Sequence, residues 1–538
     1  MPGLRAASGS PFDGVVYQIY PRSFLDADGD GVGDLAGITA QLDHLAWLGV
    51  DAVWLSPIYR SPMKDYGYDV ADHCDVDPLF GTLEDADALI AAAHERGMEV
   101  WLDFVPNHTS DRHPWFQASR ASREAPERDF YLWRDPAPDG GPPNNWIRHF
   151  ADGAPAWTFD EVTGQYYLHQ FLPEQPDLNW RNPELRERML DVLRFWIDRG
   201  VDGFRSDVIH MIGKDPALRD DEPPFAGHPR AGHHHEPEAA APHLRAIRAM
   251  LDEHPGVTMV GEVNLPVEQV AAYVGPDALH LAFQFSLLGL PWEPAAWREA
   301  IRRAHGTFDA IGVPPTWVLS NHDIPRVATR VGGQDAARTA AVLLFTLRGV
   351  PFLYMGDELG QEDAVVPSDR VVDPGGRDGC RAPIPWTASA ADRHGWAGEP
   401  WLPWPPAAAA RSVEALRADP RSILHLHRRL IALRRSVAAL RSGAMTLLDL
   451  HPDLVAYDRV ADGEVLRVLA NLGAADVDLG DPAADVGGSG DGTEVDAATT
   501  WSVLLTSDLD PAVEGARFSG VLHAGRAVVL AAVPDASY

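Results

Sequence analysis

The sequence predicts an α/β fold, a (β/α)8 TIM barrel with an inserted subdomain after strand three and a C-terminal antiparallel β-domain. Three observations support this prediction. Short β-type runs alternate with longer helix-type stretches, which is the pattern of parallel strands joined by helical crossovers. One connection, residues 107–179, is too long for a simple loop. After about residue 442 the pattern changes to alternating apolar and polar residues.

Eight β-type runs precede the change in pattern, and eight β/α repeats are what a closed barrel needs. The runs are residues 15–20, 52–55, 99–104, 203–205, 258–261, 281–285, 317–319 and 351–354. Between them lie helix-like segments such as 83–95 and 185–198, in which apolar residues recur at spacings of three and four. The barrel is therefore predicted to occupy residues 1–106 and 180–441.

Two further regions complete the predicted domain organisation. Residues 107–179 are rich in Pro, Asp, Trp and Arg, and we expect them to form a small subdomain that walls the mouth of the barrel. Residues 442–538 contain alternating patterns at 454–457 and 466–470, which are typical of antiparallel strands. An Asp/Gly-rich loop is expected within this β-domain at 481–493.

Composition narrows the class of protein. The 538 residues carry 78 Asp and Glu against 45 Lys and Arg, a net charge of −33, which disfavours nucleic acid or an anionic membrane as a partner. Only Cys74 and Cys380 occur, too few for a disulfide framework, so we expect a reduced, cytoplasmic setting. The first residues lack an apolar signal region, and 18 apolar residues never run together, so neither a signal peptide nor a membrane span is predicted.

Polar clusters follow four of the predicted strands. They are the stretch from Asp103 to His108, the pair Arg205 and Asp207, Glu262, and the stretch from Asn321 to Asp323. Any one cluster has an alternative explanation as a helix cap or a strand-end turn, where Asp and Asn are common. Barrel active sites lie at the C-terminal ends of the strands, however, and four such coincidences favour a common site.

The carboxylates Asp207 and Glu262 suggest a retaining glycosidase. That chemistry needs an ionised carboxylate as nucleophile and a protonated carboxyl as acid, roughly 5–5.5 Å apart across the scissile bond. The ends of neighbouring parallel strands can hold two side chains at this distance. Arg205, two residues before Asp207 on the same strand face, can keep Asp207 ionised. Neighbouring carboxylates should favour the protonated form of Glu262, which can then protonate the leaving oxygen.

Motifs spread over nearly the whole chain resemble those of the α-amylase superfamily, glycoside hydrolase family 13, and most of all its α-glucosidase and oligo-1,6-glucosidase members. Besides the strand-end clusters, the motifs are Val16-Tyr17-Gln18-Ile19-Tyr20-Pro21-Arg22-Ser23-Phe24, Gln175-Pro176-Asp177-Leu178-Asn179-Trp180 and Arg377-Asp378-Gly379-Cys380-Arg381. The resemblance implies that Asp207 is the nucleophile and Glu262 the general acid/base. It implies that Asp323 is a third carboxylate, which grips sugar hydroxyls and stabilises the transition state.

The same resemblance implies a set of sugar-binding side chains. Tyr68 would stack on the terminal glucose while Asp65 binds its hydroxyls; the alternative is an ordinary aromatic turn. His108 and His322 can donate hydrogen bonds to sugar hydroxyls, and Asp103 would hold the floor of the pocket. The other residues expected at the substrate site are Phe150, Phe171, Arg205 and Arg381.

An acidic loop near the N-terminus is a second signal. Its acidic residues at positions one, three, five and nine, with a glycine at six and a carbonyl at seven, reproduce most of a calcium-loop pattern, although position twelve is Gly37 instead of Glu. Resemblance to the α-glucosidases suggests a structural Ca²⁺ or Mg²⁺ that holds the loop and takes no part in the chemistry. The alternative is a solvated acidic turn. The ligands would be Asp26, Asp28, Asp30, Val32 and Asp34.

The histidine run His233-His234-His235 lies between strands four and five. Histidine clusters bind zinc and copper in many proteins. Consecutive histidines in a Pro/Gly/Glu loop do not converge on one point, so we favour an ordinary loop over a metal site here.

The resulting functional hypothesis is a retaining, exo-acting α-glucosidase that removes terminal α-1,4- or α-1,6-linked glucose from short oligosaccharides. One alternative is a glucosyl-transferring or isomerising family member that acts on trehalose- or sucrose-type substrates. Another is a non-catalytic partner protein like the heavy chains of amino-acid transporters, which the intact acidic trio and the missing membrane span disfavour. In the resembling enzymes a valine after the nucleophile, here Val208, accompanies α-1,6 linkages.

Overall fold

The computed structural model describes residues 12–150, 153–221, 236–373, 375–480 and 500–533. The histidine run 233–235 and the whole of the expected loop at 481–493 lie outside the described residues. In the described ranges every helix falls short of the length and apolarity that crossing a membrane requires.

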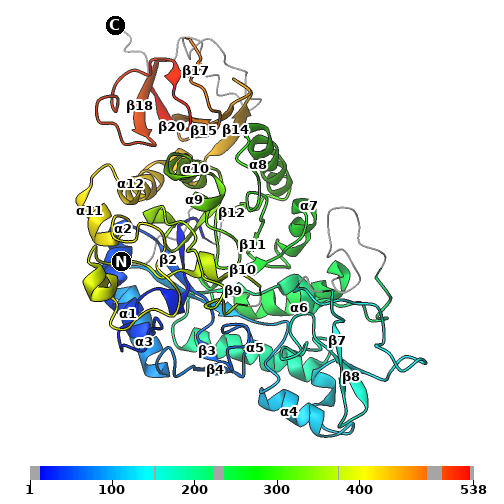
Figure 1. The fold of residues 1–538 in the computed structure, drawn as a ribbon. Coiled ribbons are helices and arrows are strands. Elements are labelled where there is room, and N and C mark those ends of the chain that lie inside the picture. Colours follow the sequence, from blue (N-terminus) through cyan, green and yellow to red (C-terminus); the bar gives the residue numbers. More distant parts are fainter. Residues whose placement is uncertain (1–11, 151–152, 222–235, 374, 481–499, 534–538) are drawn as a thin grey trace.

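Eight parallel strands form the central sheet, and each overlaps one predicted run, so the predicted barrel is confirmed (Figure 1). The strands are β1 (Val16–Ile19), β2 (Ala52–Leu55), β5 (Glu99–Phe104), β9 (Gly203–Ser206), β10 (Thr258–Glu262), β11 (Leu281–Phe283), β12 (Thr316–Val318) and β13 (Val350–Tyr354). Their order in the sheet is β11-β10-β9-β5-β2-β1-β13-β12. The three strands β5, β9 and β10, which are followed by or end in three of the four predicted polar clusters, are therefore neighbours.

The barrel closes between β11 and β12, the two ends of this sheet, through side chains. The hydroxyl of Thr316 donates to the carbonyl of Ala282 at 2.9 Å. The side-chain amide of Gln284 donates to the carbonyl of Thr316 at 2.8 Å. These polar groups lie in the barrel wall and supply the contacts that a backbone ladder supplies between the other strands.

Helices surround the barrel, and their sequence signals agree with their observed limits. They are α1 (Leu35–Ala40), α2 (Leu42–Leu48), α3 (Leu83–Glu95), α4 (Pro114–Ala121), α5 (Pro183–Asp198), α6 (Pro237–Asp252), α7 (Val267–Val270), α8 (Pro294–Asp309), α9 (Val327–Arg330), α10 (Gln334–Thr346), α11 (Val413–Ala418), α12 (Ile423–Ser436) and α13 (Ala438–Arg441). Thr82 and Asp85 form a capping box at the start of α3, whose limits are the predicted ones. The helix predicted at 185–198 begins two residues earlier, because Asn182 caps it and Pro183 occupies its first position.

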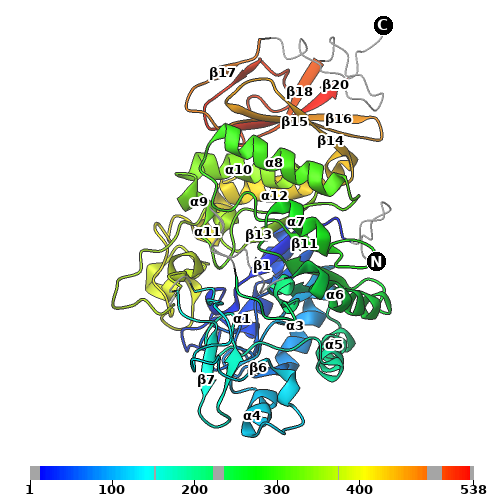
Figure 2. The ribbon, with the colours of Figure 1, turned by 90° about the vertical axis from the view of Figure 1, so that its right-hand side faces the viewer.

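Two small sheets border the mouth of the barrel. The strands β3 (Tyr59–Arg60) and β4 (Asp72–Val76) form a hairpin. Within the predicted subdomain, β6 (Trp133–Arg134), β7 (Trp157–Asp160) and β8 (Gln165–Leu168) form an antiparallel sheet in the order β6-β8-β7. Figures 1 and 2 show α4 and this sheet at one end of the molecule, opposite the C-terminal strands.

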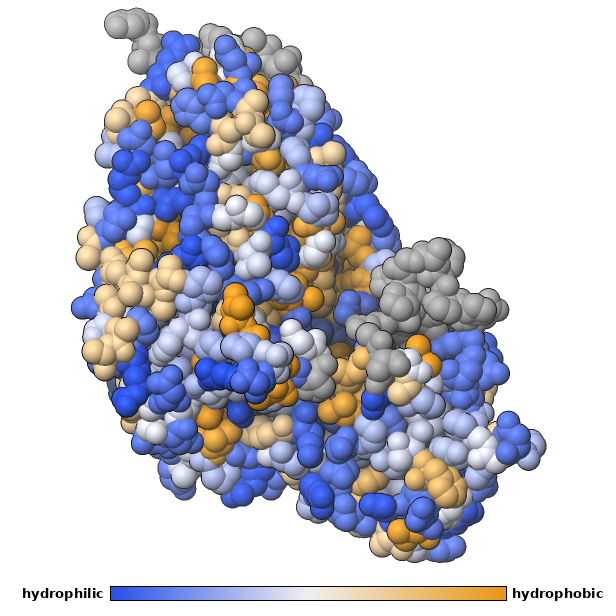
Figure 3. Space-filling model, viewed as in Figure 1, coloured by the Kyte–Doolittle hydropathy of each residue, from blue (hydrophilic) through white to orange (hydrophobic). Residues whose placement is uncertain are grey.

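The C-terminal strands form an antiparallel sheet, as predicted, in the order β14-β15-β16-β20-β18, with a separate pair β17-β19. They are β14 (Ala444–Leu448), β15 (Leu454–Ala461), β16 (Glu464–Asn471), β17 (Val477–Asp478), β18 (Thr500–Thr506), β19 (Val521–Leu522) and β20 (Ala527–Val533). The sheet lies over α8, α10 and α12 in both views (Figures 1 and 2). The molecular face in Figure 3 is mainly hydrophilic with apolar residues scattered over it, in keeping with the acidic composition.

Two buried arginines hold the end of α10 at the junction between the barrel and this sheet. Arg459, from β15, donates to the carbonyls of Thr346, Leu440 and Gly443 at 2.6, 3.1 and 3.1 Å. Arg434, from α12, donates to the carbonyls of Phe345 and Leu347 at 3.1 and 3.3 Å. The last carbonyls of a helix lack partners within the helix and carry partial negative charge, so a cation stabilises them. Burial lowers the pKa of Arg459 to about 9 and that of Arg434 to about 10, which leaves both charged at pH 7.

We predict that Arg459→Met lowers the free energy of unfolding by about 3 kcal/mol, because it leaves buried carbonyl oxygens without donors. The measurement is denaturant unfolding of the full chain. Arg302→Met is the matched control, since that side chain pairs with Asp449 at 3.4 Å across the same junction but is 48% exposed. Similar losses in the two variants would contradict the role given to Arg459.

Candidate active site

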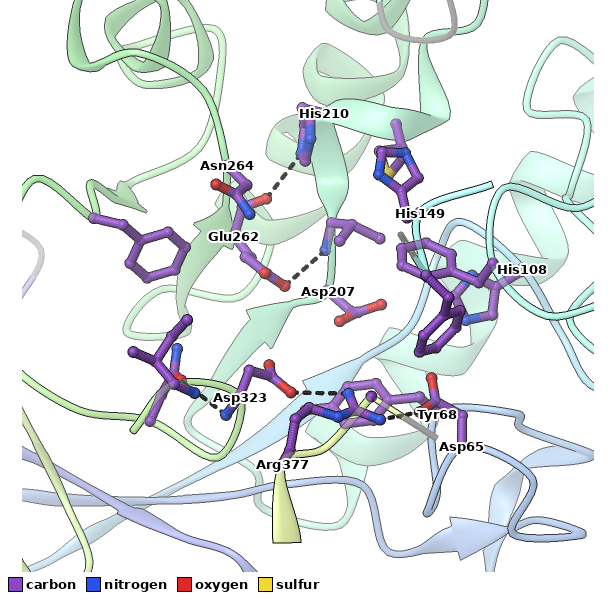
Figure 4. Close-up of a pocket in the computed structure, with 18 of the residues that line it drawn as sticks. Asp65, Tyr68, His108, His149, Asp207, His210, Glu262, Asn264, Asp323 and Arg377 are labelled. Atoms are coloured by element: carbon purple, nitrogen blue, oxygen red, sulfur yellow. Dashed lines mark hydrogen bonds and ion pairs between the residues drawn. The ribbon is translucent and has the colours of Figure 1, made fainter. Parts of the chain in front are cut away.

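A cavity of about 590 Å³ lies at the carboxyl ends of the barrel strands. Eight of the residues predicted from the sequence line it, namely Asp65, Tyr68, His108, Phe150, Phe171, Asp207, Glu262 and Asp323. Figure 4 shows the side chains of Asp207, Glu262 and Asp323 directed toward the same space. Residues far apart in the sequence meet here because parallel strands end at one edge of the barrel.

Arg205 joins the carboxyl groups beneath the cavity. Its guanidinium lies 2.7 Å from Asp103 and 2.9 Å from Asp207, and it also donates to Glu262. Its side chain is only 4% exposed. The register of the strands explains the contacts, since Asp103 on β5 stands directly beside Arg205 on β9. The sequence interpretation, which related Arg205 to Asp207 alone, missed the contact with Glu262 on the next strand.

The charges of this cluster are unequal. Burial raises the pKa of Asp207 well above its usual range, with Arg205 opposing the shift and the nearby carboxylates of Glu262 and Asp103 adding to it. Burial also raises the pKa of Asp103, to about 7. One positive charge facing three buried carboxyl groups favours the retention of a proton within the cluster. The sequence interpretation expected Arg205 to keep Asp207 ionised, whereas here burial outweighs Arg205 and favours the protonated form of Asp207. Retaining cleavage requires that Asp207 is ionised and that Glu262 carries the proton when the substrate is bound.

Asp323 behaves differently from the cluster around Arg205. Burial opposes its ionisation, but His322 and the guanidinium groups of Arg377 and Arg381 outweigh burial and lower the pKa of Asp323 well below its usual range. Arg377 lies 3.0 Å from the Asp323 carboxylate and Arg381 lies 3.1 Å from it. Asp323 is therefore an anion at pH 7 and can stabilise a positive charge that develops in the cavity.

An ion-pair bridge links Asp323 and Asp65 in the cavity wall. Arg377 contacts both, at 3.0 Å from Asp323 and 2.8 Å from Asp65, as Figure 4 shows. Asp373 holds the same guanidinium at 2.6 Å. Gln175 in turn donates to Asp65 at 3.1 Å. The sequence motif contained Arg377, but the sequence interpretation assigned the sugar-side role to Arg381.

Three residues predicted at the substrate site lie under the cavity lining, not in it. They are Arg205, His322 and Arg381. The imidazole Nε2 of His322 lies 2.8 Å from the hydroxyl of Tyr68, and the two rings are parallel with centroids 5.5 Å apart. Arg381 donates to the backbone carbonyl of His322 at 2.7 Å. In this structure these side chains position the lining residues.

The cavity has further lining residues that the sequence interpretation did not identify. They include His149, His210, Met211, Asn264, Phe285, Leu288 and Arg377. Most come from irregular loops, where no periodicity marks which side chain faces inward. Val208 also lines the cavity, with a left-handed backbone (φ +32°) that is uncommon for a β-branched residue. Its N–H donates to the Glu262 carboxylate at 3.2 Å.

Three carboxylates of the acidic loop come together, and one expected ligand does not join them. Oxygen atoms of Asp26, Asp28 and Asp34 lie within 4.8 Å of one another. Asp30 stands outside this group, and its carboxylate accepts from the N–H of Val32 at 2.7 Å. Carboxylate oxygens are hard donors of the kind that Ca²⁺ and Mg²⁺ bind, and these three could supply part of such a ligand set. Asp26 also accepts from the N–H of Gly398 at 2.7 Å, which ties the loop to a distant segment.

Comparisons with known proteins agree with this geometry. A family model described as "Alpha amylase, catalytic domain" matches residues 18–443. A probable alpha-glucosidase of Rhizobium meliloti (strain 1021) is 43% identical, with 78% of this chain and 81% of that protein covered. An oligo-1,6-glucosidase of Heyndrickxia coagulans is 38% identical, with 87% and 93% covered.

Solved structures are similar over almost the full length. A structure of the alpha-glucosyl transfer enzyme XgtA has a TM-score of 0.86 and 38% identity, with 97% of this chain and 99% of that chain covered. A structure of the trehalulose synthase MutB from Pseudomonas mesoacidophila MX-45 has a TM-score of 0.86 and 32% identity, with 98% and 100% covered.

Proposed function

Because the chain belongs to the alpha-amylase family of glycoside hydrolases, we propose that it is a retaining, exo-acting α-glucosidase that hydrolyses terminal α-linked glucose from short oligosaccharides. Asp207 and Glu262 line the same cavity at the ends of neighbouring strands, and the anionic Asp323 lies beside them. This arrangement is the main support for the proposal. Relatives named as alpha-glucosidases and oligo-1,6-glucosidases support it.

The reaction proceeds by double displacement. The carboxylate of Asp207 attacks the anomeric carbon while Glu262 gives its proton to the leaving glycosidic oxygen, so that a glucosyl ester forms as the C–O bond breaks. Glu262, now ionised, takes a proton from water as the water oxygen attacks the same carbon and releases Asp207. Asp323 stabilises the positive charge that develops on the sugar in both steps.

Exo action is supported by the bridge that Arg377 makes between Asp65 and Asp323, which come from loops after different strands. A bridge at this position would obstruct a glucan chain that continues beyond one glucose. The carboxylates of Asp65 and Asp323 and the guanidinium of Arg377 can bind the hydroxyls of one terminal glucose.

Glucosyl transfer or isomerisation is the second candidate activity. It is supported by the similarity of this chain to solved structures of a glucosyl transfer enzyme and of a trehalulose synthase. The same glucosyl ester would then react with a sugar hydroxyl instead of water. Phe285 and Leu288 give the cavity an apolar wall that can support such an acceptor. Product analysis from maltose, isomaltose, trehalose and sucrose separates the two activities. The non-catalytic alternative finds no support in relatives that are named as enzymes.

A structural Ca²⁺ or Mg²⁺ at the acidic loop is part of the proposal. Asp26, Asp28 and Asp34 would hold the ion, because their carboxylate oxygens converge. Only the sequence pattern supports Asp30 and the carbonyl of Val32 as further ligands. The ion would neutralise three converging carboxylates and fix the loop that Asp26 ties to Gly398. A cytoplasmic location stays a prediction from the low cysteine content.

Asp207 and Glu262 should respond differently to replacement by an amide, because they act in different ways in the two steps. Asp207→Asn should lower kcat by about 10³-fold or more on every glucoside, because the glucosyl ester cannot form. Glu262→Gln should retain the first step with an activated aryl α-glucoside, whose leaving group needs no proton, and azide should rescue the second step. Steady-state and burst kinetics measure both effects. Equal losses on good and poor leaving groups would contradict the role of Glu262.

Val208 is predicted to bias linkage toward α-1,6. Val208→Thr keeps the β-branched shape that already occupies this left-handed position, so the change is mainly from methyl to hydroxyl. Such an exchange alters discrimination by about 1–3 kcal/mol at most. We expect activity on isomaltose in the wild type and a lower isomaltose-to-maltose ratio of kcat/KM in the variant. An unchanged ratio would assign linkage to the 107–179 subdomain or the loop after β9.

Chelation of the proposed metal should lower the melting temperature without stopping turnover directly, because an ion that binds only the folded state stabilises it by mass action. Asp28→Asn should reproduce the effect of the chelator. Asp30→Asn is the control, since Asp30 lies outside the group of converging carboxylates. If neither chelation nor Asp28→Asn moves the melting temperature in metal-controlled buffer, the loop is a plain acidic turn.

A further inference from the structure

Gln18 lies behind His322 at the centre of the barrel. It belongs to β1, and it is 1% exposed. Its side-chain nitrogen Nε2 is 2.8 Å from Nδ1 of His322 and 3.4 Å from the hydroxyl of Ser56. An amide nitrogen can only donate, so Nδ1 of His322 has to accept this hydrogen bond.

This contact determines where His322 carries its proton. Burial, together with the nearby Arg381, Arg205 and Arg377, lowers the pKa of His322 to about 3 despite the opposing charge of Asp323, so the ring is neutral at pH 7. A neutral imidazole that accepts at Nδ1 carries its hydrogen on Nε2. Nε2 lies 2.8 Å from the hydroxyl of Tyr68 and 3.4 Å from the carboxylate of Asp323.

The direction of the next hydrogen bonds follows from this tautomer. The hydroxyl oxygen of Tyr68 accepts from His322, so its own hydrogen is free to be donated to Asp103, whose Oδ2 lies 3.2 Å away. The other oxygen of Asp103 holds Arg205 at 2.7 Å, and Arg205 holds Asp207. With the opposite tautomer, Tyr68 would donate to His322 and Asp103 would lose a donor.

We propose that Gln18 is a positioning residue for this reaction, because through His322 it sets the direction of the hydrogen bonds that hold Tyr68, Asp103 and Arg205 beneath Asp207. The inference rests on the proposed function. Tyr68 and Asp323 lie on the Nε2 side of the imidazole, whereas Gln18 is the side chain that bonds to Nδ1. The rings of Tyr20 and Tyr68 lie parallel to it at 5.6 and 5.5 Å, and Trp54 meets it edge-on at 6.5 Å.

The test compares Gln18→Glu with Gln18→Met by kcat/KM for an activated aryl α-glucoside. At a pH above the pKa of His322 in this variant, where the imidazole is neutral, a carboxylate at position 18 accepts where the amide donated and draws the single imidazole hydrogen to Nδ1. Compared at that pH, Gln18→Glu should lower kcat/KM by about 100-fold. Methionine removes the hydrogen bond to Nδ1 of His322 without reversing its direction, so Gln18→Met should lower kcat/KM by about 10-fold. Outer partners that fix histidine tautomers at metal sites have effects of about 10–100-fold. Wild-type kinetics in both variants would overturn the proposal.

A double-mutant cycle separates positioning from packing. Gln18→Met introduced into His322→Asn should cause less than about a 2-fold further loss, because the residue through which Gln18 acts is gone. An equal loss in both backgrounds would overturn the proposal and make Gln18 a barrel-filling residue. Gln284→Met is the matched control for a buried glutamine in the barrel wall, since Gln284 bonds to Thr316 instead of His322. It should lower the melting temperature and leave kcat/KM unchanged.

A readout without substrate distinguishes failure of this inference from failure of the proposed function. In the wild type the folded-state pKa of His322 lies below its unfolded value, so its contribution to stability is present above pH 6.5 and lost as pH falls. In Gln18→Glu an imidazolium paired with the carboxylate has a raised pKa, and its stabilisation is present below pH 6.5 and lost as pH rises. The melting temperature should therefore depend on pH differently in Gln18→Glu and in Gln18→Met between pH 5 and 8.

If the two variants gave the same pH dependence of the melting temperature, the contact between residue 18 and His322 would be refuted, whatever substrate the enzyme hydrolyses. Should Gln18→Glu not fold, the cycle with Gln18→Met decides.

Discussion

The guanidinium of Arg205 is the interaction on which the rest of the site depends. Three acidic side chains at the ends of three adjacent parallel strands meet at one buried cation. Burying one charge is expensive and burying several of the same sign is more so, unless each has a partner. The position of Arg205 therefore limits where Asp103, Asp207 and Glu262 can lie, and the remaining parts of the site are arranged around them.

The barrel could be predicted from the sequence because strands buried on both faces are continuous apolar runs, and the polar clusters that follow four of these runs mark the active face. All three acidic residues of the family trio line the cavity that these strands form. The contacts across strands could not be predicted in this way. That Arg205 reaches Glu262 depends on strand order and register, which the residue pattern of a single strand does not contain.

Loops explain the other differences between sequence and structure. Arg377 and Arg381 lie at the start and the end of a short 3-10 helical turn, and only the structure shows that Arg377 faces the cavity while Arg381 lies beneath it. The calcium-loop pattern likewise placed Asp30 with Asp28, but the turn directs the Asp30 carboxylate to a backbone N–H. Residue type specifies the chemistry that is possible, whereas the local path of the backbone selects which side chain performs it.

The way the barrel closes has a consequence for the cavity wall. β11 and β12 are joined at their ends by the side chains of Gln284 and Thr316, and these strands lead directly into Phe285 on one side and Asp323 on the other. Net hydrogen-bond energies are on the order of 1 kcal/mol each, so this line offers less resistance to separation than a full backbone ladder. Amide exchange should therefore be fastest at this line among the barrel strands, whereas the strands that carry the Arg205 cluster are joined to one another by backbone ladders.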